Sequence, residues 1–171
     1  MKKLILIALV SIFGVFSTNA QKFALMDMEY ILENIPAYQK ANDELALLSK
    51  QYQQAIEAKA KEAETMYNTY QKTSATMSAT QRTQKEEAIV AKEKEIAEMR
   101  KKYFGPEGEM VKRQAELLSP IQDQIYEAVK QISIQKEYDA VIDRSSATGL
   151  FFASPRIDIS NEILKKLGYS K

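Results

Sequence analysis

The sequence predicts an α+β protein, mostly α-helical, in which a long antiparallel helical hairpin projects from a small β body. Residues 37–104 contain no Gly or Pro and are rich in Ala, Glu, Lys and Gln, the strong helix formers. Apolar residues recur through the chain's middle in steps of three, four and seven, the spacing of a coiled-coil seam. Short segments rich in β-forming residues stand at both ends of this helical region.

Residues 1–20 have the layout of a cleaved secretory signal. Lys2 and Lys3 precede the apolar run 4–16, and small residues lead to Ala20. The apolar run is shorter than the ~20 residues that a membrane-spanning helix needs. A retained N-terminal anchor is the alternative. We therefore expect an exported and soluble mature chain, residues 21–171, which forms one domain.

Composition argues against several function classes. Without Lys2 and Lys3 the chain has 22 basic and 23 acidic residues, a net charge of −1, which does not indicate a nucleic-acid partner. The chain has no His and no Cys, which removes the usual general base, the thiol nucleophile and most zinc ligands. No phosphate-binding loop is present. We expect no enzyme activity, no metal and no cofactor.

Acidic and basic residues at the ends and on the arm have structural explanations. Asp27, near a strand end and a helix N-terminus, is interpreted as a structural acid rather than a catalytic or calcium-binding one. Asp143 and Arg144 are interpreted as solvated residues at a strand edge. Basic residues of 82–102 alternate with glutamates, which is typical of a solvated, ion-paired helix face.

The apolar seam predicts two helices that pack along each other. Its outbound members include Leu45, Leu48, Tyr52 and Ile56. On the return, residues recur every seven positions and then in threes and fours: Ile89, Ile96, Tyr103, Met110, Leu118, Ile121, Ile125, Ala128 and Ile132. We expect the arm to cover residues 30–136.

The ends predict a body formed by 22–28 and 138–168. Strands are expected at 22–28, 138–143 and 149–154, with "SSATG" as the connection of a hairpin between the last two. A final helix is expected over 158–168, with Asp158 as N-cap and Gly168 after its C-terminus.

The first strand precedes the arm and the others follow it, so the arm must reverse if all share one sheet. The midpoint lies near residue 83, beside a Ser- and Thr-rich stretch. Ser78 with Gln81, or Thr83 with Glu86, has the spacing of a capping box, so we expect the tip near 76–83. A linker between two domains or one unturned helix are the alternatives.

Two helix breakers interrupt the returning arm. "FGPEG", residues 104–108, is the strongest turn signal in the chain, yet reversal there would give arms of unequal length. We interpret it as a kink or a short interruption in the returning arm. Ser119 and Pro120 resemble the start of a helix and predict a local restart.

Three short strands and one short helix bury too little apolar surface to stand alone. Self-association into a larger sheet or barrel would bury their apolar residues and protect the strand edges. The residues expected in this oligomeric body are Phe23, Leu25, Val141, Ile142, Leu150 and Phe152.

Met and aromatic residues near the outer arm suit a surface that accepts varied apolar partners. The candidates are Met66, Tyr67, Tyr70, Met77, Met99, Tyr103 and Phe104. Each could instead pack one arm helix on the other. Arms with sparse apolar patches would hold unfolded chains weakly at many points.

"KFALMDMEYILENIPAYQKANDEL", the helical hairpin and the tail "YDAVID…DISNEILKKLG" resemble the Skp or OmpH family of outer-membrane-protein chaperones. The resemblance covers residues 22–168, and the arms match mainly by pattern. It implies a homotrimer with a small β-barrel body and three helical arms. It also implies a periplasmic holdase that keeps unfolded outer-membrane proteins from aggregating without ATP.

The chain departs from the family in two respects. Its best-known members are strongly basic, so basic arm surfaces and any lipopolysaccharide site do not carry over to this near-neutral chain; transient contact with a membrane surface stays open. "FGPEG" and Pro120 interrupt an arm expected to be more continuous. The alternative function is a structural coiled-coil envelope protein, a spacer or assembly scaffold with one fixed folded partner.

Overall fold

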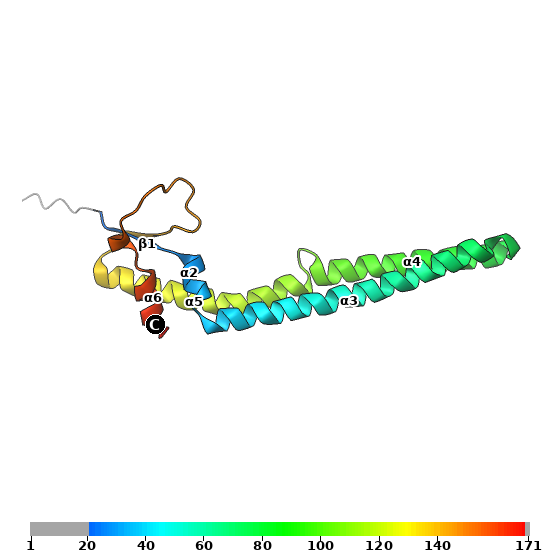
Figure 1. Ribbon diagram of the computed structural model, residues 1–171, viewed down its shortest axis with the longest axis horizontal. Helices are drawn as coiled ribbons and strands as arrows, with labels where there is room; N and C mark the ends of the chain where they lie inside the picture. The colour runs from blue at the N-terminus through cyan, green and yellow to red at the C-terminus, as the bar shows by residue number, and fades with distance from the viewer. Residues whose placement is uncertain (1–20, 170–171) are drawn as a thin grey trace, which may run out of the picture.

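A long helical arm extends from a small mixed body in the computed structural model, which describes residues 21–169 (Figure 1). The predicted signal, residues 1–20, lies outside the described residues. Along the chain the elements are β1 (Phe23–Met26), α2 (Met28–Glu33), α3 (Pro36–Thr73), a 3-10 turn (Ser74–Thr76), α4 (Ala79–Phe104), α5 (Glu109–Lys136), β2 (Ala140–Asp143), a second 3-10 turn (Pro155–Ile157) and α6 (Ser160–Lys166).

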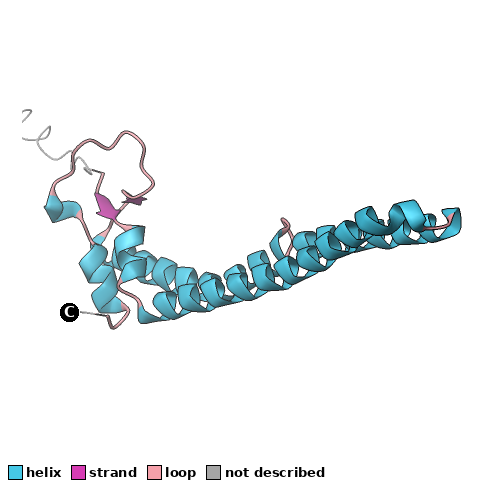
Figure 2. Cartoon of the chain, turned by 45° about the vertical axis from the view of Figure 1, so that its right-hand side comes forward, coloured by secondary structure: helices cyan, strands magenta, loops and turns pink. Residues whose placement is uncertain are grey.

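Helix α3 forms one side of the arm, and α4 followed by α5 forms the other (Figures 1 and 2). α3 has 38 residues, about 57 Å at 1.5 Å per residue. It begins with Pro36 in its first turn, where a missing N–H costs no hydrogen bond. The antiparallel hairpin is confirmed, and the alternative of one unturned helix is wrong.

The arm reverses at residues 74–78, at the N-terminal side of the predicted range. α3 ends at Thr73, one 3-10 turn follows, and Ser78 starts the return. Ser78 Oγ accepts the N–H of Gln81 at 3.3 Å, and Gln81 Oε1 accepts the N–H of Ser78 at 2.9 Å. Of the two capping-box registers in the sequence, the chain uses this one. Thr83 lies inside α4, and its hydroxyl donates to the carbonyl of Ala79.

The return is interrupted at 105–108, between α4 and α5. Pro106 disfavours a helical backbone at Gly105, whose ψ is 169°. A Cβ at Gly105 would lie 2.3 Å from the carbonyl oxygen of Lys101, so this close approach requires glycine. Of the two interpretations of "FGPEG", the short interruption is the one found, since α4 and α5 are separate helices.

The predicted restart at Pro120 is wrong, because α5 runs through it without interruption. Pro120 removes one helical hydrogen bond, whose acceptor would be the carbonyl of Glu116. Both residues are exposed, so water can satisfy that carbonyl. Ile121 and Ile125 directly beyond it are buried and hold the helix against the body.

The body contains two parallel strands rather than three. β1 pairs with β2 in the register Phe23↔Ala140 to Met26↔Asp143, and the whole arm is the crossover between them. The predicted hairpin is wrong: residues 149–154 form a loop. Its apolar residues find no packed face within one chain, and strand preference depends on such packing. The segment before α6 occupies the other side of β1, where the Ile159 N–H donates to the Leu25 carbonyl at 2.8 Å.

A single core lies where α2, α6, β1 and the inner end of α5 meet. Its largest fully buried side chains are Ile31, Ile125, Ile132 and Ile163. The body therefore includes part of α5, beyond the two terminal segments predicted.

α6 begins at Ser160, two residues later than predicted. Asp158 still caps it in effect, since its Oδ1 accepts the Ser160 N–H at 2.9 Å. Gly168 follows the helix with φ +86°, as expected. The N–H of Gly168 bonds to the Lys165 carbonyl and that of Tyr169 to the Leu164 carbonyl, which is a Schellman ending.

Candidate binding surfaces of the arm and the body

A small apolar cluster holds the outer half of the arm together. Ile56, Ala63 and Ile96 are buried between α3 and α4, with Ala60, Met99 and Tyr103 packed against them. Of the candidate contact residues, Met99 and Tyr103 therefore serve mainly as packing between the two arm helices.

Aromatic residues gather at the break in the returning arm. Tyr52 of α3 stacks on Tyr103 with ring centroids 4.0 Å apart, and Phe104 meets Tyr52 edge-on at 6.2 Å. Phe104 remains 41% exposed. It is thus both a packing residue and an accessible apolar surface.

The remaining candidates lie along the outer third of the arm. Tyr67 is 49% exposed and borders an open cavity of about 420 Å³, with Ala60, Ala63 and Ile96 at its apolar side. Met66, Tyr70 and Met77 are half-buried. Tyr70 donates its hydroxyl to Glu86 across the arm, which raises the pKa of Tyr70. Tyr67 and Phe104 are therefore the most accessible of the seven.

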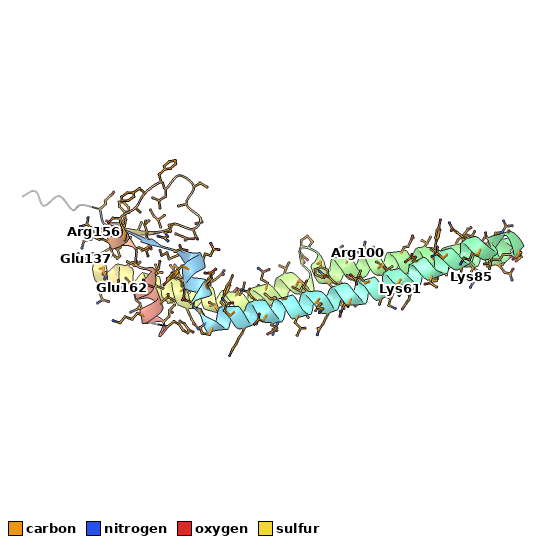
Figure 3. The ribbon with its side chains drawn as sticks, in the orientation of Figure 1. Lys61, Lys85, Arg100, Glu137, Arg156 and Glu162 are labelled. Atoms are coloured by element: carbon orange, nitrogen blue, oxygen red, sulfur yellow. The ribbon has the colours of Figure 1, made fainter. Side chains whose placement is uncertain are left out.

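Ion pairs cover the arm between these apolar points. Lys59 and Lys92, one from each helix, share Glu62 and Glu95 at 2.9–3.6 Å. Hydrogen bonding to Lys92 is the main cause that lowers the pKa of both carboxyls. The ion-paired face read from the sequence is confirmed here, and its pairs also cross the arm. Lys61, Lys85 and Arg100 lie along the same outer half (Figure 3).

The acids at the strand ends have structural roles. Asp27 caps α2, as its Oδ1 accepts the Tyr30 N–H at 3.0 Å, and it also pairs with Arg144. The Tyr30 N–H and Arg144 hold the pKa of Asp27 below its ordinary value. Asp143 accepts the N–H groups of Met28 and Ser145. Asp143 and Arg144 lie at the end of β2 as predicted, and Arg144 is half-exposed, but both also tie the strand ends to their neighbours.

The body residues predicted for self-association divide into two groups. Leu25 is 4% exposed, and Val141 packs against the core, so both contribute to the single chain's own interior. Phe23, Ile142 and Leu150 are 43–45% exposed, and Phe152 is 83% exposed. The side chains of the second group are exposed to solvent in a single chain.

Further large apolar side chains are exposed in the body, outside the residues predicted for self-association. They include Phe151 (98%), Tyr126 (65%) and Ile134 (71%). Tyr126 and Ile134 lie outside the stripe of buried residues on α5. The sequence carries this signal, because neither residue fits the three- and four-residue spacing of Ile121, Ile125, Ala128 and Ile132.

Within residues 21–169, no helix is long and apolar enough to cross a membrane. Over the same residues, no cluster of three or more acidic side chains is placed to hold a metal ion.

The sequence model of the outer membrane protein (OmpH-like) family matches residues 22–167. The chain belongs to this family. Two relatives named chaperone protein Skp are each 26% identical to this OmpH-like chain. The one from Yersinia enterocolitica aligns over 88% of both chains. The one from Photorhabdus laumondii aligns over 98% of this chain and 99% of its own.

A solved structure has the same fold. An OmpH-like outer membrane chaperone of Caulobacter crescentus superposes with a TM-score of 0.67 at 12% identity, over 90% of this chain and 88% of its own. At this identity, the likeness concerns the fold alone. The OmpH-like fold, with helical arm and small sheet, is therefore confirmed for the chain.

Proposed function

We propose that this OmpH-like chain is a periplasmic, ATP-independent, non-enzymatic chaperone that binds unfolded outer-membrane proteins between its arms and prevents their aggregation. The relatives named Skp chaperones support the chaperone role. In this chain the proposal rests on the surface of the arm. Only a narrow seam is packed between the arm helices, and isolated apolar side chains remain exposed among charged ones.

Such a surface suits weak binding at many points. Full burial of one large apolar side chain stabilises by about 1.5–3 kcal/mol, and half-exposed residues such as Tyr67 and Phe104 contribute less. Several weak contacts on one flexible client act together through effective concentration. Met66, Tyr70 and Met77 would add to this surface near the tip, while Met99 and Tyr103 would support it from the seam.

We further propose that the chain works as a homotrimer whose bodies join. The exposed group of Phe23, Ile142, Leu150 and Phe152 supports this, because association that removes large apolar side chains from water is favourable. Association would bury them and leave three arms around a common space. The outer edge of β2 would be covered at the same time.

Export through a cleaved signal at residues 1–20 completes the proposal. The intact mass of the purified periplasmic protein tests it, and a chain that begins at Gln21 is expected. A retained N-terminus would contradict export by cleavage. Transient contact with a membrane surface stays a prediction.

The chaperone role is tested by diluting a urea-unfolded outer-membrane β-barrel protein into buffer and following its light scattering. The mature chain is expected to suppress scattering at a near-stoichiometric ratio without ATP. The double variant Tyr67→Ser, Phe104→Ser should suppress less, whereas Gln71→Ser, a polar change on the same arm, should match the wild type.

A folded, oligomeric protein that leaves aggregation unchanged would contradict the chaperone role. Recovery of one folded partner from the cell envelope, with no unfolded clients, would favour a structural scaffold instead.

A further inference from the structure

The two sides of the arm differ at its middle. On one side α3 is continuous from Pro36 to Thr73. On the other side the helix is replaced by residues 105–108, which bulge away from α3 (Figures 1 and 2). An open cavity of about 710 Å³ lies beside this bulge, bordered by Lys101, Pro106 and Lys112.

The bulge has a defined backbone. The Gly108 N–H donates to the Gly105 carbonyl at 2.8 Å. A Cβ at Gly108 would lie 2.8 Å from both the Gly105 nitrogen and the Tyr103 carbonyl oxygen. Both glycines are therefore needed for this tight turn, which joins two helices without continuing either.

Tyr52 of α3 contacts both ends of the break. Its ring stacks on Tyr103, in the last turn of α4, with an interplanar angle of 4°. Its hydroxyl donates to Glu109 Oε2, in the first turn of α5, at 2.5 Å. Lys102 lies 3.4 Å from the same carboxylate. One side chain on the continuous helix thus fixes α4 and α5 relative to each other.

Bending a pair of packed helices requires one of them to change length relative to the other. With axes 8–10 Å apart, a bend of about 20° changes the relative path by about 3 Å, or two residues of helical rise. An unbroken helix cannot supply this without losing hydrogen bonds. A four-residue break can supply it by opening or tightening its turn.

We propose that the 105–108 break is a bending joint of the arm, and that Tyr52 is the clasp that holds the joint in its present angle. Bending of α3 toward or away from the break is taken up by the bulge, which has open space beside it. Release of Tyr52 from Tyr103 and Glu109 frees the outer half of the arm to swing. The joint lies within one chain, so it is testable whether or not the chain binds unfolded proteins.

The test measures the distance across the break. Ala97 of α4 and Ala115 of α5 are exposed, and the chain has no native cysteine, so Ala97→Cys and Ala115→Cys allow clean spin labelling. Labelled chains are diluted with unlabelled protein so that pulsed electron resonance reports distances within one chain. The wild type is expected to give one narrow distribution. Tyr52→Ala should broaden or shift it by about 3 Å, as a bend of about 20° requires.

A matched control exists farther along the arm. Tyr70 also donates its hydroxyl to a glutamate of the returning helix, Glu86, but there α4 is unbroken. Tyr70→Ala should therefore leave the Ala97–Ala115 distribution unchanged. An unchanged distribution in Tyr52→Ala, or equal broadening in Tyr70→Ala, would overturn the proposal.

A milder variant decides the matter if Tyr52→Ala loses helicity by circular dichroism. Tyr52→Phe keeps the ring that stacks on Tyr103 and removes only the bond to Glu109. We expect it to broaden the distribution less than Tyr52→Ala but more than Tyr70→Phe. If Tyr52→Phe and Tyr70→Phe both match the wild type, Tyr52 is no clasp.

Discussion

At the scale of single residues, Glu137 marks the place where the arm returns to the body. Its backbone is left-handed, with φ 57° and ψ 46°, directly after α5. This conformation costs an L-residue with a Cβ about 1–2 kcal/mol, and glycine adopts it without that cost. The left-handed turn directs β2 alongside β1, and the pairing of the two strands offsets this cost.

Glu137→Gly is therefore expected to stabilise the protein by about 0.5 kcal/mol, since relief of the left-handed strain exceeds the extra entropy of glycine in the unfolded chain. Urea unfolding at fixed protein concentration measures it. Gln131→Gly, an exposed change within α5, should instead destabilise by about 1 kcal/mol. Destabilisation by both variants would contradict the strain at Glu137.

Asp27 predicts an acid-dependent loss of stability. Its pKa lies below the ordinary value of 3.8, so its contribution is present above that value and is lost as pH falls through the lower, folded-state pKa. Asp27→Asn keeps a capping side chain but removes the pair with Arg144. Between about pH 6 and about pH 3, the urea midpoint of the variant should fall less than that of the wild type. If the urea midpoints of variant and wild type fall equally, Asp27 does not cause the acid-dependent loss of stability.

At the scale of elements, helix ends follow from local chemistry. Pro36 starts α3, Gly105 and Pro106 end α4, and Gly168 follows α6, all as their residue types predict. The predicted helix restart at Pro120 is wrong, because a proline on the exposed side of a helix is tolerated when buried neighbours hold that helix in place. Tertiary packing thus overrode a local signal.

The tip offers a test of its cap. Ser78→Ala removes the acceptor for the Gln81 N–H and should cost about 1 kcal/mol, with faster amide hydrogen exchange in the first turn of α4. Thr83→Ala should leave exchange at the tip nearly unchanged, because Thr83 bonds only to the carbonyl of Ala79. Faster exchange in Thr83→Ala but not in Ser78→Ala would contradict the start of α4 after Ser78.

At the scale of the whole molecule, the sequence predicted the helical hairpin of the arm but not the strand arrangement of the body. Heptad spacing and the Gly105–Pro106 pair are local signals, so they predicted the packed helices of the arm and the interruption at 105–108. Residues 149–154 resemble a strand, but they form a loop, since strand pairing depends on what lies beside them. Pairing of Tyr52 with Glu109, 57 positions apart, leaves no local signal at all.

For the candidate surfaces, the sequence predicted the residue types but not their exposure. Residue type identified the apolar side chains, but only the packing of α3 on α4 separates exposed Tyr67 from Met99 in the seam. In the body, Leu25 and Phe152 look alike in sequence, yet one is buried and the other 83% exposed.

Exposure of Phe152 predicts an effect on assembly. Phe152→Ser should weaken association and shift the molecular mass toward a single chain at low concentration, because it removes apolar surface from the proposed interface. Phe104→Ser, which removes a partly exposed ring from the arm, should leave the mass unchanged. Equal masses for Phe152→Ser and wild type would place the interface elsewhere.

We propose that one chain makes an incomplete body, which three copies complete. Light scattering coupled to size-exclusion chromatography measures the mass of the mature wild-type protein directly. Three times the mass of one chain, with the helical circular dichroism of the hairpin, is the predicted result. A monomer with the same helicity would contradict the shared body and the space between the arms.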